Sequence, residues 1–341
     1  MGISLDSPDL YTIGWIAPLS IERAATTALL DERHDAPDGF EQHQSDKNSY
    51  TWGRMSGHNI VIASLPVGIH GSVPAATTAT GLLASLPHIR IGLLVGIASG
   101  VARPHQGQDV RLGDVVVSQP YGILGGVIQY DKGKATSDNS WEMVGSLNMP
   151  PQVLLHALSS ILEEHEINGS RVPELLQAMW TAYPNMAKPK KAVPGYVYQG
   201  FEHDRLFLST YTHGDGEGCR DCDSRHEVAR DKRATPDPEV HYGIIASGNT
   251  ELADAASRDV IVDMVGGDCL SIDMEAAGLM NHFPCLVIRG ICDYADSHKG
   301  NRWRRYASAT AAAYAKELLS FVPTRDLAAT ARAIDILQSG E

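Results

Sequence analysis

Short apolar runs alternate with stretches of small or amphipathic residues along most of the 341-residue chain. Such runs, bounded by glycine and polar residues, are typical of strands buried on both faces of a parallel sheet. Residues 50–55 and 59–65 predict a hairpin, which would add antiparallel strands. The stretches at 73–86 and 307–321 predict helices, so the alternation indicates an α/β fold. The clearest apolar runs are residues 11–16, 89–95, 241–247 and 285–288.

We predict one α/β domain over residues 1–323, with a mixed, twisted and partly closed sheet and helices on both sides. The pattern changes over about residues 132–238, where predicted helices at 151–164 and 172–183 are flanked by polar and proline-containing links. We interpret this stretch as a helical insertion that decorates a single core. Residues 324–341 are predicted to form a C-terminal tail or linker.

The stretch from residue 271 to residue 296 carries the clearest candidate chemistry. It reads as a helix, a short connection, a buried strand and an acidic turn, with Glu275 at the helix start and Asp293 at the strand end. Ligands of open α/β sheets bind beyond the carboxyl ends of strands. An ionised Glu275 can accept two hydrogen bonds from a cis-diol, and a buried Asp293 can donate a proton to a leaving group. Alternatively, the two carboxylates only cap the helix and the following turn.

Two short motifs in this stretch resemble a known family. Residues 274–277 read Met-Glu-Ala-Ala, and Cys292-Asp293 follows about one strand later. This pairing resembles the signature of the nucleoside phosphorylase/nucleosidase superfamily, which includes purine and uridine phosphorylases and methylthioadenosine nucleosidases. The resemblance extends, with insertions, over about residues 11–322. More narrowly, the chain resembles fungal nucleoside-phosphorylase-like domains found ahead of NTPase-and-repeat receptor modules.

The resemblance implies a role for each residue of the two motifs. Glu275 would bind the ribose hydroxyls, Met274 would pack on the sugar, and Asp293 would protonate the purine at N7. Cys292 stands where the family often has serine, which leaves a small polar contact in question. The implied reaction is cleavage of the N-glycosidic bond of a purine nucleoside or nucleotide.

The attacking nucleophile is expected to lie beside one acid and two glycine-rich turns. Glu22, after the first strand, matches the glutamate that activates water in the nucleosidase branch, although it could simply complement a helix dipole. The turn residues implied to lie at the phosphate or nucleophile position are Gly68, His70, Gly96 and Ser99. His70 is read more readily as a hydrogen-bonded structural histidine.

One departure from the family pattern indicates whether water or phosphate is the nucleophile. Bacterial-type purine phosphorylases hold phosphate with an arginine and a serine where this chain has Leu94 and Ile97. Phosphate binds best to arginine through paired hydrogen bonds, so we expect hydrolysis in preference to phosphorolysis. Phosphorolysis stays open, with phosphate as co-substrate, because Arg54, Arg103 or a neighbouring subunit could supply the cation. A nucleotide-sensing domain with weak catalysis is a third reading.

The predicted base-binding segment follows the strand at 241–247. The resemblance places the purine base against this segment, chiefly through backbone contacts. Its residues are Ser247, Gly248, Asn249, Thr250 and Leu252.

Charge and composition limit the kinds of molecule that the protein is expected to bind and the compartment in which it is expected to lie. The formal net charge of −13 opposes duplex nucleic-acid binding, which depends on neutralising phosphates. No apolar run approaches the roughly 20 residues that span a bilayer, and no signal peptide is visible at the N-terminus. Five cysteines, three of them in apolar segments, suit a reducing compartment. We therefore expect an intracellular, cytoplasmic protein that binds a small purine compound and forms a homo-oligomer, either a dimer or larger.

A Cys-x-x-Cys pair lies inside the insertion. Cys219 and Cys222, with His213 and His226 nearby, invite a zinc interpretation. Only one cysteine pair is present, so a reduced structural pair, or a disulfide formed on purification, is the favoured reading. We expect the catalytic site to contain no metal and to need no organic cofactor.

Overall fold

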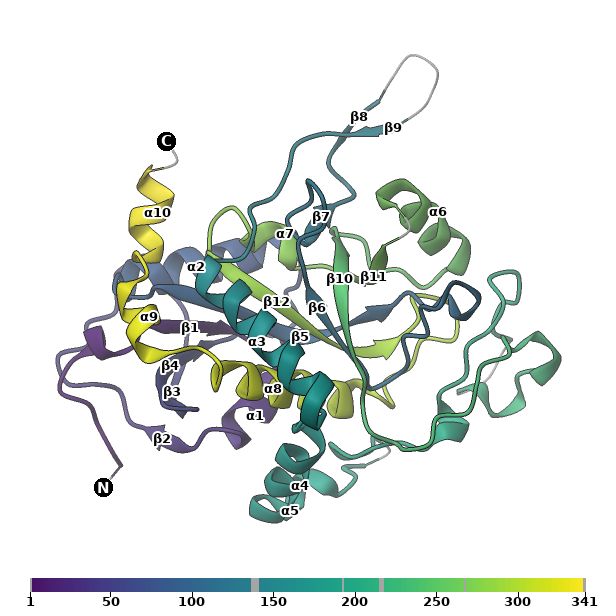
Figure 1. Cartoon of the computed structure of the whole chain (residues 1–341), viewed down its shortest axis with the longest axis horizontal. Helices are drawn as coiled ribbons and strands as arrows, with labels where there is room; N and C mark the ends of the chain where they lie inside the picture. Colours follow the sequence, from purple (N-terminus) through teal and green to yellow (C-terminus); the bar gives the residue numbers. More distant parts are fainter. Residues whose placement is uncertain (1, 136–140, 192, 215–217, 267, 340–341) are drawn as a thin grey trace.

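The computed structural model describes residues 2–135, 141–191, 193–214, 218–266 and 268–339. Its centre is a ten-stranded mixed sheet (Figure 1), with the order β11-β10-β6-β12-β5-β1-β4-β3-β2 and with β7 beside β10. The strands are β1 Ile13–Ile16, β2 Glu32–His34, β3 Tyr50–Met55, β4 His58–Ala63, β5 Ile91–Gly100, β6 Val115–Ser118, β7 Val127–Gln129, β10 Val240–Ser247, β11 Cys269–Asp273 and β12 Cys285–Asp293.

One side of the sheet closes on itself. Strand β11 pairs with β10 in parallel and also with the end of β5, where Ser271 faces Gly100 in an antiparallel register. The predicted partly closed sheet is therefore confirmed. The predicted hairpin is also present, because β3 and β4 pair antiparallel from Tyr50–Ala63 to Met55–His58.

Successive side chains of the central strands enter two different cores. Ile13 and Trp15 of β1 point to one core, whereas Ile16 points to the other. Strand β5 divides in the same way, with Leu93 in the first core and Leu94 in the second. Side chains alternate across a strand, so a continuous apolar run is what a strand buried on both faces requires.

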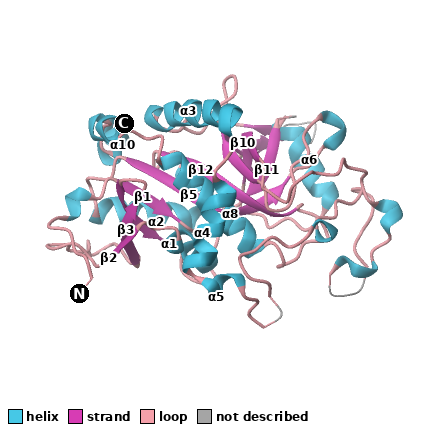
Figure 2. Cartoon of the chain, turned by 60° about the horizontal axis from the view of Figure 1, so that its bottom comes forward, coloured by secondary structure: helices cyan, strands magenta, loops and turns pink. Residues whose placement is uncertain are grey.

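Helices cover both faces of the sheet (Figure 2). The first core lies under α1, α3, α4 and α8, and the second lies under α2, α7 and α10. Helix α8 is almost entirely buried and packs across β5 and β12. The helices are α1 Ser20–Ala28, α2 Ser72–Ser85, α3 Gln152–Asn168, α4 Val172–Ala182, α5 Pro184–Ala187, α6 Ala255–Val265, α7 Ala276–Leu279, α8 Arg304–Leu319, α9 Thr324–Ala329 and α10 Ala333–Ser339.

The inserted stretch has two structural parts. Helices α3 and α4 contribute Leu154, Ile161 and Leu176 to the first core, and the buried Glu317 of α8 accepts hydrogen bonds from Ser170 Oγ and Arg171 N, both at 2.9 Å. The later part instead contains short helical turns at Phe201–His203, Cys219–Asp221 and Ser224–His226. Its Arg230 and His213 bond to Tyr294 and Ser297, which follow β12. The small hairpin of β8 Gly133–Ala135 and β9 Trp141–Met143 projects away from the body (Figure 1).

No described helix combines the length and apolarity needed to cross a membrane.

The end of the chain packs on the core. Leu327 of α9 and Ala333 of α10 are buried, and Ala333 N donates to the carbonyl of Ile89 at 2.8 Å. The stretch predicted as a tail or linker thus contains two short helices in contact with the domain.

Candidate active site

Asp293 is the last residue of β12 and pairs in register with Ser99 of β5. Ser99 Oγ donates to Asp293 Oδ1 at 2.5 Å, and the N–H of Ala295 donates to the same oxygen at 2.9 Å. Ala295 has a φ of +53°, which is uncommon for a residue with a side chain. The other oxygen, Oδ2, lies 3.8 Å from Lys299 Nζ. One carboxylate oxygen is therefore fixed by the backbone turn and β5, while the other faces a cation.

Glu22 lies in the first turn of α1 and is only 2% exposed. Its Oε2 accepts from the N–H of Leu19 at 2.5 Å, and its Oε1 accepts from the N–H of Ile97 of β5 at 2.8 Å. Burial raises the pKa of Glu22 to about 7, against the opposing charge of Arg289. A carboxylate that titrates near neutral pH is suited to take a proton from water.

Arg289 connects the acids of the site. It lies inside β12 and is completely buried. Its Nε donates to Asp273 Oδ2 at 2.9 Å, and its Nη2 donates both to Asp273 and to Glu275 Oε2, the latter at 3.2 Å. Its Nη1 has no hydrogen-bond partner among the described residues. Arg289 is not among the site residues predicted from the sequence, although an arginine within an apolar strand is a signal, because a buried charge requires partners.

Gly96 allows Arg289 and Glu22 to approach each other. A Cβ on this residue would lie 2.6 Å from both Arg289 Nη1 and Glu22 Oε1. Gly96 pairs in register with Arg289 across the β5–β12 ladder. The glycine therefore leaves the buried guanidinium and the carboxylate on the same side of the strand with no side chain between them.

Glu275 precedes the single-turn helix α7 and is 8% exposed. Its Oε1 accepts a long hydrogen bond of 3.4 Å from the N–H of Gly71, and its Oε2 accepts from Arg289. Burial raises the pKa of Glu275, although the charge of Arg289 opposes the shift. Glu275 occupies the N-cap position of the helix, but its side chain makes no capping hydrogen bond, and the Asp273 carboxylate accepts from Ala276 N instead. Met274 is half-buried beside it.

The predicted base-binding residues lie around Tyr130, which the sequence analysis did not single out. The Tyr130 hydroxyl donates to the carbonyl of Thr250 at 3.3 Å, and its ring packs on Gly248. Leu252 is buried in the same apolar cluster. Two of the predicted side chains hold the protein itself together. Ser247 Oγ accepts from Ala277 N at 2.9 Å, and the Asn249 side chain accepts from Ser72 and donates to Asp131.

Gly68 and His70 lie on an exposed turn before α2. This turn lines a cavity of about 330 Å³ together with Leu19, Arg23 and Lys47. Leu19 is also the residue whose N–H binds Glu22, so the cavity adjoins that acid. Arg23 and Lys47 line the cavity with neutral hydrogen-bond partners, since Arg23 donates to Thr51 and Ser49 and Lys47 donates to the carbonyl of Gln44.

The sequence and the fold resemble known proteins to different degrees. No protein-family model matches the sequence. Futalosine hydrolase of Helicobacter pylori superposes with a TM-score of 0.56 at 14% identity, covering 92% of this chain and 99% of that one. The 5′-methylthioadenosine/S-adenosylhomocysteine nucleosidase of Neisseria meningitidis, in complex with methylthio-immucillin-A, gives 0.56 at 15% identity, covering 91% and 99%. The chain has the nucleoside phosphorylase/nucleosidase fold.

A longer protein shares more of the sequence. A nucleotide-binding leucine-rich repeat (NLR)-like protein of Hyaloscypha variabilis is 38% identical over 321 residues, which is 94% of this chain. The chain spans 30% of the length of that relative. The match therefore occupies one part of a much longer protein.

Within this fold, β5 brings most of the predicted catalytic residues together. Ile97 N binds Glu22, Ser99 binds Asp293, and Gly96 faces Arg289, which binds Glu275. The three acids expected around one sugar are thus linked through one strand and one arginine.

Proposed function

We propose that the chain hydrolyses the N-glycosidic bond of a purine nucleoside or nucleotide. The observation that carries this proposal is the buried pair of Glu22, whose pKa is raised to about 7, and the unpaired Nη1 of Arg289 beside it. A buried N–H without a partner is costly, and here it is suited to hold the oxygen of an attacking water. The carboxylate next to it is suited to receive the proton of that water.

The proposed reaction uses the three acids in separate roles. Asp293 donates a proton to N7 of the purine, and the electron pair of the C1′–N9 bond passes to the base as that bond breaks. Glu275 accepts hydrogen bonds from the 2′- and 3′-hydroxyls, which stabilises the oxocarbenium-like sugar. Glu22 takes a proton from water as the water oxygen bonds to C1′. This scheme uses no metal and no organic cofactor.

Phosphorolysis is less well supported by the charges of the site. Orthophosphate carries more than one negative charge near neutral pH and needs cations. Arg289 already pairs with Asp273 and Glu275, and the nearby Glu22 would repel the anion once ionised. The negative charge of Glu22, and the pairing of Arg289 with two other carboxylates, therefore favour a neutral nucleophile.

A sensing role is the second candidate, and the similarity to an NLR-like protein is its support. In that case the domain would bind a purine compound and turn it over slowly or not at all. Such a domain would transmit occupancy to the remainder of a longer chain.

Incubation with candidate substrates separates these proposals. We would add adenosine, methylthioadenosine, inosine, AMP or ATP, with and without phosphate, and measure free base by chromatography. Base release without phosphate is expected. Release only with phosphate would replace hydrolysis by phosphorolysis, whereas tight binding without release at high protein concentration would support the sensor.

A further inference from the structure

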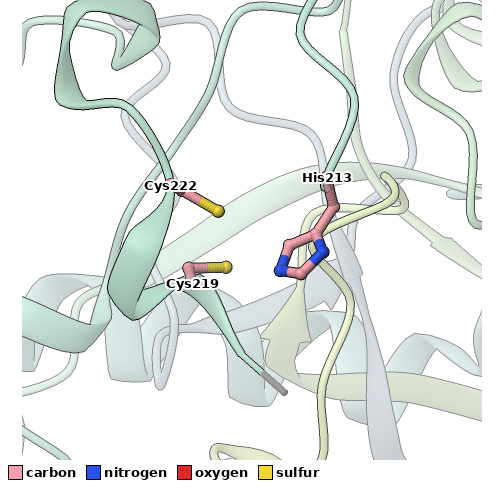
Figure 3. Close-up of side chains that lie close together, drawn as sticks. All are labelled: His213, Cys219 and Cys222. Atoms are coloured by element: carbon pink, nitrogen blue, oxygen red, sulfur yellow. The ribbon is translucent and has the colours of Figure 1, made fainter. Parts of the chain in front are cut away.

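Three potential metal ligands converge in the inserted segment, beside the loop that follows Asp293. The Nδ1 or Nε2 of His213 and the Sγ atoms of Cys219 and Cys222 all lie within 4.8 Å of one another. Figure 3 shows both sulfur atoms directed towards the edge of the His213 ring. Both cysteines are free thiols, so they do not form a disulfide.

Local backbone structure brings the ligands together. The short helical turn Cys219–Asp221 places Cys219 and Cys222 three residues apart on the same side of the chain. Gly218 precedes the turn with a φ of +80°, a left-handed conformation that glycine adopts without strain. The pair therefore has the geometry of a Cys-x-x-Cys metal knuckle.

Both ring nitrogens of His213 face backbone carbonyl oxygens. Its Nδ1 lies 2.5 Å from the carbonyl oxygen of Gly214, and its Nε2 lies 3.1 Å from that of Gly218. A neutral imidazole has only one N–H, so one ring nitrogen faces an acceptor without a proton. Donation from Nδ1 to Gly214 would leave the Nε2 lone pair for a metal, which is the usual way a backbone carbonyl orients a metal-binding histidine.

We propose that His213, Cys219 and Cys222 bind a structural zinc ion. Two thiolates balance its charge, and one imidazole with two sulfurs is a ligand set that zinc prefers. At Zn–S distances of about 2.3 Å, tetrahedral ligands lie about 3.8 Å apart, so small side-chain rotations would complete the geometry. Water or a further side chain would take the fourth position.

A second cluster of possible ligands does not support the same inference. Asp114, Glu239 and His241 also lie close together. Asp114, however, already accepts hydrogen bonds from Arg233 and His241. The Arg233 side chain supplies the cation there. At the cysteines, Arg205 donates to the backbone carbonyls of Cys219 and Cys222, and no arginine or lysine side chain among the described contacts bonds to their thiols.

The proposed zinc would brace the loop that follows Asp293. The N–H of His213 donates to Ser297 Oγ at 2.9 Å, and Cys219 Sγ lies 4.0 Å from the carbonyl oxygen of His298. The His298 ring stacks on Phe207 of the insertion, with 4.1 Å between the ring centroids. The metal would therefore fasten the inserted segment to residues 293–299, whatever reaction the domain carries out.

Metal content tests the proposal directly. Full-length protein purified under reducing conditions and supplied with zinc chloride should retain about one zinc per chain after gel filtration, measured by elemental analysis. A mercurial thiol reagent should release this zinc from the unaltered protein. Cobalt in place of zinc should give the visible absorption of a tetrahedral thiolate site.

Variants assign the ligands. Cys219→Ser, Cys222→Ser and His213→Gln should each weaken zinc binding by about two orders of magnitude. Cys269→Ser and His105→Gln, which alter a thiol and an imidazole elsewhere, should keep it. Unaltered, folded protein that retains no zinc would overturn the proposal. Zinc retained at full stoichiometry in the Cys219→Ser/Cys222→Ser double variant would also overturn it.

Discussion

At the scale of single residues, the site depends on a buried arginine. Arg289 is the only cation that contacts both Asp273 and Glu275 among the described residues, and its charge also acts on Glu22. Burying several carboxylates together is costly without a compensating charge. Arg289 therefore allows Glu22 and Glu275 to lie close enough that, besides burial, the charge of Glu275 raises the pKa of Glu22.

The role of Asp293 as proton donor leads to a first prediction. Asp293→Asn keeps the size of the side chain but cannot release the proton, so turnover should fall by about 10² to 10⁴-fold. The change should appear in kcat, measured from initial rates of base release. Asp263→Asn, an exposed acid on α6, is the matched control and should retain full activity. Near-normal turnover in Asp293→Asn would remove this residue from the mechanism.

The pKa of Glu22 leads to a second prediction. A general base must be ionised, so Glu22 should give kcat/KM an acid-side limb that rises with pH until about pH 7, where burial places the pKa of Glu22. Below that pH, the rate should fall about tenfold per unit as the carboxylate gains a proton. Profiles of kcat/KM from pH 5 to 9 measure this limb. Glu22→Gln should abolish the limb along with most of the activity, and a limb that persists would assign it to another group.

At the scale of elements, β12 and α8 pack so closely at Gly290 that no side chain fits between them. A Cβ on Gly290 would lie 1.8 Å from the carbonyl oxygen of Ala307. Both atoms belong to regular elements, so relief would require movement of the helix or the strand. This close approach explains why a glycine stands at position 290 of β12.

Gly290→Ala should therefore destabilise the fold. We expect the free energy of unfolding to fall by at least about 3 kcal/mol, since overpacking against backbone cannot be relieved by a rotamer change. Gly300→Ala, in a loop where a Cβ meets nothing within 4 Å, should change stability by about 0.5 kcal/mol or less. Urea titrations followed by circular dichroism compare the two variants. Equal stabilities would show that α8 adapts freely.

Elements were predicted well where a continuous hydrophobic run decided them, but residues 271–273, read from the sequence as the start of a helix, form the end of strand β11. The runs at 11–16 and 285–288 became β1 and β12 because burial on both faces requires continuous apolar sequence. The antiparallel contact of β11 with β5 depends on three-dimensional closure, which no local pattern encodes. Arg289 was missed for a related reason, because its partners Asp273 and Glu275 lie on the preceding segment and become neighbours only in the fold.

At the scale of the whole molecule, the end of the chain belongs to the core. Leu327 of α9 is 2% exposed and lies in the first core, whereas Ile336 of α10 is 38% exposed. Leu327→Ala should cost about 2–4 kcal/mol by leaving a cavity, and Ile336→Ala should cost about 0.5 kcal/mol or less. Thermal melts and urea titrations measure both. Equal, small losses would mean that α9 detaches in solution and behaves as a linker.

The course of β5 has a consequence for how such a chain can change in evolution. Residues 97 and 99 hold the proposed base and acid two positions apart on one strand, which corresponds to about 6–7 Å of strand length. The long inserted segment enters and leaves the sheet elsewhere, so it can gain or lose residues while that separation stays the same. A single residue added between positions 97 and 99 would instead turn Ser99 to the opposite face. Length variation among descendants of this protein should accordingly accumulate in the insertion and spare β5.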